Sequence, residues 1–265
     1  MNHMRTRHIL NLSGGKDSTA LAVFMRDKVP EMEYVFCDTQ KELPETYEYL
    51  ERVEAYLGKP IVRLNAERGF DHWLQIYGGL LPSSQARWCT RKLKLEPFEE
   101  YVGSDPVYSY VAIRADENRS GYISTKPNIT AIFPFKEAGI TKSDVFRILD
   151  ESGLYLPQYY EWRTRSGCYF CFFQRQSEWV GLKERHPDLF ELAKAYEKIN
   201  SETGERFTWR HGESLAELER PERMEEIRAN RETLDKEASV PKLVTLTSLI
   251  NADDEEDLGC VMCHL

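Results

Sequence analysis

The first half of the chain alternates short apolar runs with longer amphipathic segments. The short runs, typical of buried strands, occupy residues 8–12, 34–37, 60–64 and 107–113. Segments with apolar positions at helical spacing occupy residues 19–26, 44–57 and 141–151. This alternation predicts an α/β fold built on a doubly wound parallel sheet, because parallel strands need helical crossovers.

The pattern changes beyond residue 153, where aromatic and basic residues are interleaved from 159 to 179. Such a segment is typical either of a helical core or of a surface on which bases stack. A helix is predicted over 184–200, and Glu and Arg at i to i+4 spacing over 214–237 predict a solvated acidic helix. We therefore expect an α/β domain at 1–153 and an appended helical module at 154–265.

Composition narrows the class of protein. The 265 residues are 41% hydrophobic and 30% charged, with a mean hydropathy of -0.56, which predicts a globular protein without membrane association. The net charge of -9 argues against nucleic-acid binding by the whole surface and leaves only a local basic strip. Six cysteines without an export signal predict a cytoplasmic protein that keeps its thiols reduced.

A glycine-containing loop joins the first predicted strand to the first predicted helix. It consists of Ser13, Gly14, Gly15, Lys16, Asp17 and Ser18. Backbone N–H groups and hydroxyls at the start of a helix converge on an anion, and the helix dipole favours negative charge there. The adjacent glycines distinguish this loop from the GxxxxGK[ST] loop. The loop therefore predicts a phosphate site.

Five motifs occur in order between residues 8 and 175. They are 13–18 (SGGKDS), 36–39 (FCDT) with 44–46 (PET), 88–90 (WCT) with Lys94 and Pro97, 113–117 (IRADE) with Arg119, and Gly167-Cys168 with Cys171. With these motifs the chain resembles the adenine-nucleotide alpha-hydrolase, or PP-loop, superfamily and its phosphoadenylylsulfate reductase branch. The resemblance implies a sheet of the PP-loop ATP pyrophosphatase type, with ATP bound across the carboxyl ends of its strands.

The same resemblance assigns roles to charged residues. Asp17 and Asp38 are the candidate Mg²⁺ ligands, since Mg²⁺ prefers oxygen. The catalytic candidates, expected to surround the triphosphate and stabilise the leaving pyrophosphate, are Lys16, Asp17, Lys94, Arg114 and Arg119.

Two CxxC pairs, Cys168 with Cys171 and Cys260 with Cys263, have the spacing of metal ligands. Structural Zn²⁺ held by all four is one solution. The resemblance implies a second, a [4Fe–4S] cluster that also uses Cys89. Because Thr90 follows Cys89 where that reductase branch has a second cysteine, the fourth ligand would come from the tail. We favour the cluster, which leaves one tail thiol to carry a persulfide.

The chain looks most similar to the ATP pyrophosphatases of DNA phosphorothioation. We therefore expect an enzyme that adenylates a substrate oxygen, with DNA as substrate, a cysteine desulfurase as sulfur donor and other modification proteins as partners. The acidic helix at 214–237 is a candidate docking surface, and whether the protein forms a homodimer stays open. The alternatives are a sulfonucleotide reductase, a thiolation enzyme for tRNA or a small molecule, and a subunit that senses a nucleotide without turnover.

Overall fold

The computed structural model describes residues 6–118, 124–199 and 206–239, and the chain divides into two compact units. Among the described residues, the N-terminal unit contains those up to 76 together with 87–168, and the C-terminal unit contains 77–86 and those from 169 to 239. The domain boundary expected after residue 153 stays a prediction: Gly153 ends a helix in the left-handed conformation, and the two compact units divide after Cys168. In the described part of the chain, no helix is long and apolar enough to cross a membrane.

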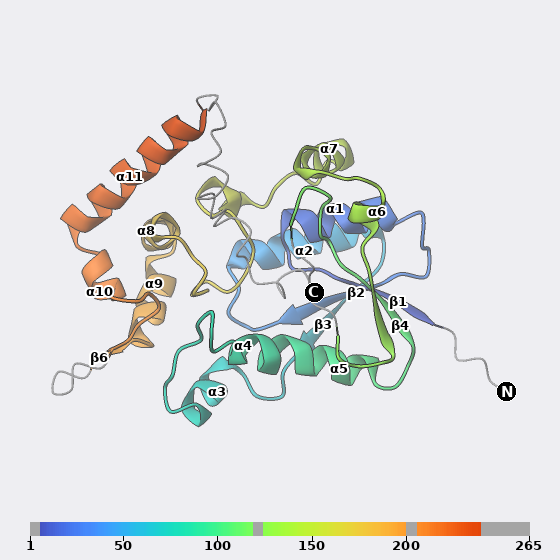
Figure 1. Cartoon of the computed structure of the whole chain (residues 1–265), viewed down its shortest axis with the longest axis horizontal. Helices are drawn as coiled ribbons and strands as arrows, with labels where there is room; N and C mark the ends of the chain where they lie inside the picture. The colour runs from blue at the N-terminus through green and yellow to red at the C-terminus, as the bar shows by residue number, and fades with distance from the viewer. Residues whose placement is uncertain (1–5, 119–123, 200–205, 240–265) are drawn as a thin grey trace. The chain divides into compact units, whose positions relative to one another are not determined.

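The N-terminal unit is built on a five-stranded, fully parallel sheet in the order β3-β2-β1-β4-β5 (Figure 1). Its strands are β1 (Arg7–Asn11), β2 (Glu33–Asp38), β3 (Ile61–Asn65), β4 (Val107–Tyr110) and β5 (Ile129–Ile132). The predicted doubly wound α/β fold is confirmed. The strand predicted at 107–113 is shorter than expected, and β5 was not predicted.

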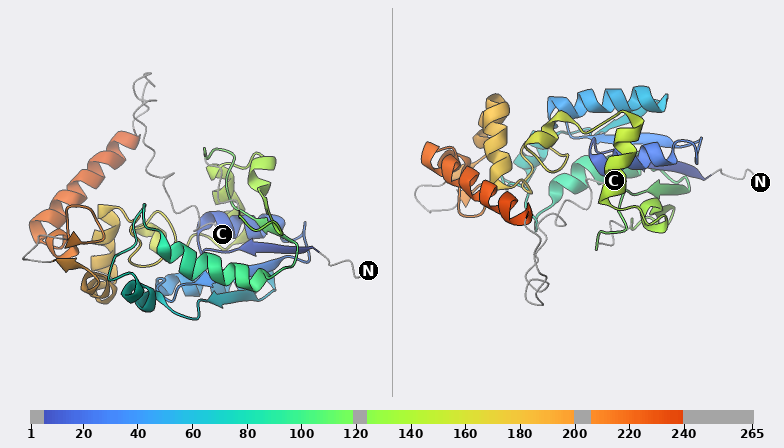
Figure 2. Two further views of the ribbon diagram at one scale, coloured as in Figure 1. Left: turned by 60° about the horizontal axis from the view of Figure 1, so that its bottom comes forward. Right: turned by 90° about the horizontal axis from the view of Figure 1, so that it is seen from above.

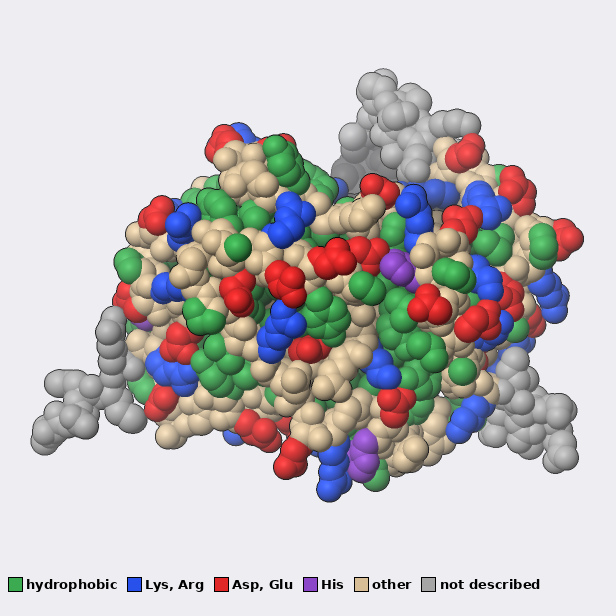
Figure 3. Space-filling view, turned by 180° about the vertical axis from the view of Figure 1, so that it is seen from behind, with side chains coloured by type: hydrophobic (Ala, Val, Ile, Leu, Met, Phe, Trp, Pro, Cys, Tyr) green, Lys and Arg blue, Asp and Glu red, His purple; other side chains and the backbone are tan. Residues whose placement is uncertain are grey.

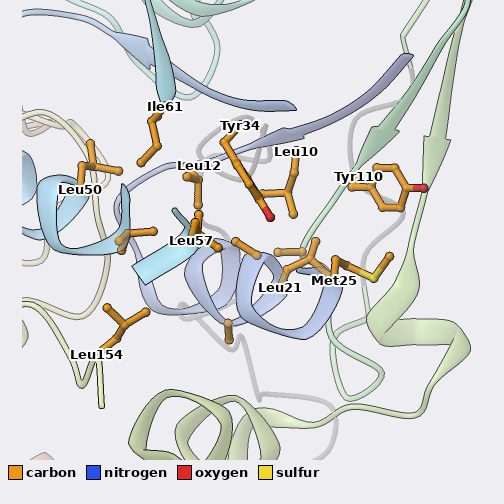
Figure 4. Packing of buried hydrophobic residues seen from close by; sticks show 14 of the residues in the cluster. Leu10, Leu12, Leu21, Met25, Tyr34, Leu50, Leu57, Ile61, Tyr110 and Leu154 are labelled. Carbon is orange, nitrogen blue, oxygen red and sulfur yellow. The ribbon is translucent and has the colours of Figure 1, made fainter. Parts of the chain in front are cut away.

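Alternating side chains of the strands fill two hydrophobic cores, one on each face of the sheet. Leu10 and Tyr34 belong to the first core, which packs against α1 (Lys16–Met25), α2 (Pro44–Leu57) and α7 (Lys142–Ser152). Figure 4 shows Leu21 and Met25 of α1 directed toward the sheet in this core. The neighbouring strand residues Ile9 and Val35 belong to the second core, against α5 (Glu96–Val102). The period of two along each strand thus places helices on both faces.

The remaining short elements of this unit are α3 (Phe70–Ile76), α4 (Trp88–Thr90), the π-helix η1 (Arg91–Leu95), α6 (Pro134–Glu137) and the 3₁₀-helix η2 (Gln158–Glu161). Figure 1 and Figure 2 show α4, η1 and α5 continuing one another as a single helical rod. The π-helical turn in its middle carries Lys92 and Lys94. Such turns are single-turn irregularities that occur frequently at functional sites.

The C-terminal unit is mainly helical, as expected for the appended module. Its elements are α8 (Gln176–Arg185), α9 (Pro187–Ala195), the strand pair β6 (Lys198–Ile199) and β7 (Arg206–Phe207), α10 (Leu215–Leu218) and α11 (Pro221–Ser239). Its core contains aromatic residues: Phe170 stacks on Trp209 with ring centroids 4.9 Å apart, and Trp179 lies 6.2 Å from the same ring. The buried Tyr169 and Phe170 therefore serve packing, which favours the helical-core interpretation for this part of the aromatic segment.

Two helix predictions in this unit are wrong in their extent. The helix predicted at 184–200 is the end of α8 followed by α9, because Pro187 lacks the N–H that a continuing helix needs. The acidic stretch at 214–237 forms α10 and α11, separated before Pro221. Ion pairs bind its charges to α8 and α9, as between Lys183 and Glu219 at 2.7 Å and between Arg228 and Glu184.

Candidate nucleotide site

The glycine loop lies at the point where the strand order of the sheet reverses. It follows β1, and β1 lies between β2 and β4. Successive strands are added on one side of β1 as far as β3, and then on the other side from β4. Ligands of doubly wound sheets bind at this switch point, outside the carboxyl ends of the strands. The chain topology therefore places the predicted phosphate loop where such a site is expected.

Hydrogen bonds within the loop fix its shape. The hydroxyl of Ser18 accepts from the backbone N–H of Ser13 at 3.1 Å and donates to the carbonyl of Gly15 at 3.2 Å. The Gly15 N–H in turn donates to the Ser13 hydroxyl at 3.3 Å. Ser18 is fully buried, so these bonds are shielded from water. The two serines thus hold the loop in one conformation before any anion arrives.

Both glycines are required by close contacts. Gly14 has a φ of 72°, and a Cβ there would lie 2.7 Å from Cγ2 of Thr46. A Cβ on Gly15 would lie 2.7 Å from Oγ of Ser166. Any side chain at either position would push its neighbours away, and at Gly14 it would also strain the backbone.

A second segment, residues 158–167, covers the loop and was not predicted as part of the site. The Tyr159 hydroxyl donates to the Gly14 carbonyl at 2.8 Å, and the Lys16 N–H donates to the Tyr160 hydroxyl at 3.1 Å. The Ser166 hydroxyl contacts the Ser13 hydroxyl at 3.1 Å. The aromatic and polar residues of this segment were visible in the sequence, but only tertiary structure brings them to a loop more than 140 positions away.

Charged residues gather where the loop meets the segment that follows β4. Nη1 of Arg114 lies 2.9 Å from Oδ1 of Asp17 and 2.7 Å from Oε1 of Glu117. Lys16 Nζ lies 3.3 Å from Oδ2 of Asp17, and Nε of Arg114 donates to Asp116 at 3.0 Å. Burial alone would lower the pKa of Arg114, but the charges of Asp17 and Glu117 outweigh it and raise that pKa. The site therefore holds a permanently charged guanidinium beside the phosphate loop.

Of the other predicted charged residues, the structure describes Asp38 and Lys94. Asp38 ends β2, and its Oδ1 accepts from the Gln40 N–H and the Tyr47 hydroxyl, both at 2.8 Å. Lys94, on η1, lines a small cavity together with Ser13 of the loop, Glu42 and five other residues. Arg119 lies outside the described residues.

The predicted cysteine ligands are only partly described. Cys168 Sγ lies 3.1 Å from the Thr39 hydroxyl and 3.7 Å from Oε1 of the buried Glu42. Cys89 lies in α4, and Cys171 lies just beyond the end of the N-terminal unit. Cys260 and Cys263 lie outside the described residues.

Within the described ranges, no three His, Cys, Asp or Glu side chains form a group that could hold a metal ion. The [4Fe–4S] cluster and its Zn²⁺ alternative each require at least one tail cysteine, so both stay predictions. Cys37 is a buried member of the second core, and burial raises its thiol pKa to about 12. Cys37, the one cysteine not predicted as a ligand, is therefore a core residue with a protonated thiol.

The fold and the loop define an α/β protein of the PP-loop type. Residues 7–172 match the model of the family described as "Phosphoadenosine phosphosulfate reductase domain". Because this match covers more than half of the chain, the chain belongs to that family. The family consists of nucleotide-utilising enzymes of the PP-loop type, and its shared region contains the loop, Lys94, Arg114 and Cys168.

Similar curated proteins come from an archaeon and from phages. Two uncharacterised proteins of Methanocaldococcus jannaschii are 30% and 28% identical to this chain, each over 68% of it. The matched parts are 39% and 45% of those proteins, so the chain spans less than half of their length. An uncharacterised protein of Escherichia phage 186 is 24% identical over 73% of this chain and 75% of its own.

A solved structure, the phosphoadenylyl-sulfate reductase from Candida auris in a phosphate complex, is also similar. It shares 15% identity at a TM-score of 0.49, covering 62% of this chain and 82% of that one.

Proposed function

We propose that the protein is an ATP pyrophosphatase that adenylates a substrate oxygen and prepares that position for sulfur insertion. The observation that carries the proposal is the preformed loop at the switch point, with Lys16, Asp17 and Arg114 around its helix end. A loop of this kind binds the phosphates, and buried fixed cations stabilise charge as pyrophosphate leaves.

The residues present fit a nucleotide bound with Mg²⁺. When bound, Mg²⁺ would neutralise phosphate charge, and Asp17 and Asp38 offer the oxygen ligands it prefers. Asp17 is almost fully buried and lies within the loop, in the first turn of α1. Lys16 and Arg114 would hold the phosphate chain in position for attack by the substrate oxygen. Lys94 reaches the same loop from η1 and would add a further positive charge.

The acceptor in this proposal is a backbone phosphate of DNA, as in the phosphorothioation enzymes that the chain resembles. On the face shown in Figure 3, Lys and Arg are interspersed with Asp and Glu. Such a surface and the net charge of -9 argue against contact with DNA through the whole face, so the proposed contact is made by a local strip of cations. A cysteine desulfurase would supply the sulfur, and α10 with α11 is its candidate docking surface. Other modification proteins complete the proposed assembly.

The cysteines are proposed to serve the sulfur step. Cys168 belongs to the same unit as the loop, and its neighbour Glu42 lines a cavity with Ser13. A [4Fe–4S] cluster on Cys89, Cys168, Cys171 and one tail cysteine fits this role, and structural Zn²⁺ is the alternative.

A second candidate, a sulfonucleotide reductase, is favoured by the family match itself. Such an enzyme acts on a sulfate group that is already adenylated and therefore releases no pyrophosphate.

The two candidates differ in their products. Anaerobically purified full-length protein would be incubated with ATP, Mg²⁺ and DNA, and separately with adenylyl sulfate and its 3′-phosphorylated form plus a thiol reductant. The proposal predicts pyrophosphate in the first reaction, with AMP released only when a sulfur nucleophile displaces it from the adenylated substrate, and no sulfite in the second. Sulfite without pyrophosphate would establish the reductase instead, and binding of ATP without either product would indicate a nucleotide sensor.

A further inference from the structure

The charged cluster at the loop contains more carboxylates than cations, which is unexpected for a site that binds a polyanion. Three carboxylates, those of Asp17, Asp116 and Glu117, lie within ion-pair distance of the two cations Lys16 and Arg114. Both cations are therefore already paired with carboxylates where a triphosphate would bind. A nucleotide entering alone would have to break these ion pairs before it could contact the cations. A divalent cation that takes the place of one cation beside a carboxylate would release that cation for the phosphates.

Arg114 divides its hydrogen bonds between buried and exposed partners. Its Nη1 contacts Asp17 at 2.9 Å and Glu117 at 2.7 Å, and these two side chains are only 4% and 5% exposed. Its Nε contacts Asp116, which is 37% exposed. In a buried setting, breaking either of the first two ion pairs is costly unless another charge replaces the missing partner. Asp17 and Glu117 are thus the partners that fix the guanidinium.

The two buried partners come from different parts of the chain. Asp17 belongs to α1, whereas Glu117 lies three residues after Arg114, and its backbone N–H donates to the Arg114 carbonyl at 3.3 Å. Glu117 can therefore stay with Arg114 through a local turn even when the ion pair with Asp17 is broken.

We propose that a divalent cation entering with the nucleotide replaces Arg114 as the partner of Asp17, and that Glu117 then keeps Arg114 at the switch point. Glu117 is a positioning residue in this proposal, which rests on the proposed function, because it acts on the nucleotide only through Arg114. The guanidinium exchanges its hydrogen bond to Asp17 for one to a phosphate oxygen, for which its planar set of donors is suited. Divalent cation and nucleotide consequently bind as one unit.

The test is a titration of Mg²⁺ that follows equilibrium binding of ATP to the full chain. Glu117→Gln leaves Asp17 as the buried anionic partner of Arg114, so Mg²⁺ must compete against a stronger pair. The Mg²⁺ concentration for half-maximal ATP binding should rise about tenfold, the effect expected from one hydrogen bond between charged groups. Asp116→Asn is the matched control, because it removes the same unit of charge from an exposed partner of the same guanidinium, and it should not raise this concentration.

Glu117→Asp keeps the charge at this position and should bring the Mg²⁺ requirement back towards the wild-type value. If Glu117→Gln does not fold, Glu117→Ala serves as the neutral variant. Its Mg²⁺ requirement is then compared with that of Glu117→Asp. An unchanged Mg²⁺ requirement in the neutral variant, or an equal shift in Asp116→Asn, would overturn this inference alone. Absence of ATP binding by the wild-type protein would overturn the proposed function together with it.

Discussion

The phosphate loop and the cysteine positions differ in how much of each site a single segment provides. The loop is contiguous, and its serines close it through hydrogen bonds that span at most five residues. The predicted cysteine ligands are scattered: Cys89 and Cys168 belong to one compact unit and Cys171 to the other. A loop held by local hydrogen bonds takes its shape once the flanking strand and helix form. A metal site made of distant thiols forms only when the chain has folded around it or when the metal itself binds.

The largest expected effect is the loss of pyrophosphate release when Asp17, in the phosphate loop, is substituted. Asp17→Asn keeps the size of the side chain but removes the charge that contacts Arg114 and Lys16. Pyrophosphate release from ATP should fall by about 100-fold or more, as when one group that stabilises developing charge is removed. A steady-state assay at saturating Mg²⁺ measures this. Turnover within a few-fold of the wild type would remove Asp17 from the site.

The next effect concerns the cysteines and should leave the fold intact. Cys168→Ser replaces a thiolate ligand by a hydroxyl, a poor partner for iron in a cluster or for Zn²⁺, so metal bound per chain should fall by at least half. Elemental analysis and the optical spectrum of anaerobically purified protein measure it. Cys37→Ser is the matched control, because Cys37 is buried in the second core, and its metal content should equal that of the wild type. Equal metal in both variants would contradict the ligand assignment.

A smaller effect tests how tightly the loop is packed. Gly14→Ala places a Cβ 2.7 Å from Thr46 Cγ2 on a backbone with a φ of 72°. Overpacking of this kind costs about 1–3 kcal/mol of the free energy of unfolding. Gly58→Ala is the matched control, since its φ of 64° is similar but no atom lies within 4 Å of the new Cβ. Denaturant unfolding should show a clearly larger loss for Gly14→Ala, and equal losses would contradict the packing argument.

The smallest expected effect is a change in stability at the amino ends of β1 and β2, away from the loop. Arg7 donates to both carboxylate oxygens of Glu33 at 2.9 and 2.7 Å, and this hydrogen bonding lowers the pKa of Glu33 against the effect of burial. The pair therefore stabilises the fold above the ordinary pKa near 4.5, and the stabilisation is lost as the pH falls through the lowered value. Glu33→Gln should cost about 1 kcal/mol at neutral pH.

The pH dependence provides the check on that ion pair. Unfolding measured between neutral pH and about pH 3 should show the difference between wild type and Glu33→Gln shrinking as the acid limit is approached. A difference that stays constant with pH would show that the cost comes from packing rather than from the charge.

Local patterns predicted much of the first unit. Residues 8–26 form strand, loop and helix as predicted, because one apolar run and one glycine turn determine them. The strand β5 was missed since Ile129–Ile132 has only four residues and weak alternation. The partner of Asp17 depends on β4 lying next to β1, which no local pattern contains. Tyr159 and Ser166 were missed as neighbours of the loop for the same reason.

The breaks in the helical module have a simpler cause. Pro187 and Pro221 each begin a helix, and periodicity of apolar and charged residues runs across them undisturbed. A proline fits the first turn of a helix and not its interior, so it was the signal that could have divided both predictions.

Binding of a nucleotide by the loop at the switch point underlies every functional proposal for this protein. A calorimetric titration of ATP with Mg²⁺ tests it in the wild type and in Ser18→Ala, which removes the hydroxyl that bonds Ser13 and Gly15. We expect saturable binding at one site per chain, weakened by about tenfold in the variant. Equal affinity in both proteins would place the nucleotide elsewhere, and no binding to the wild type would contradict the proposed function.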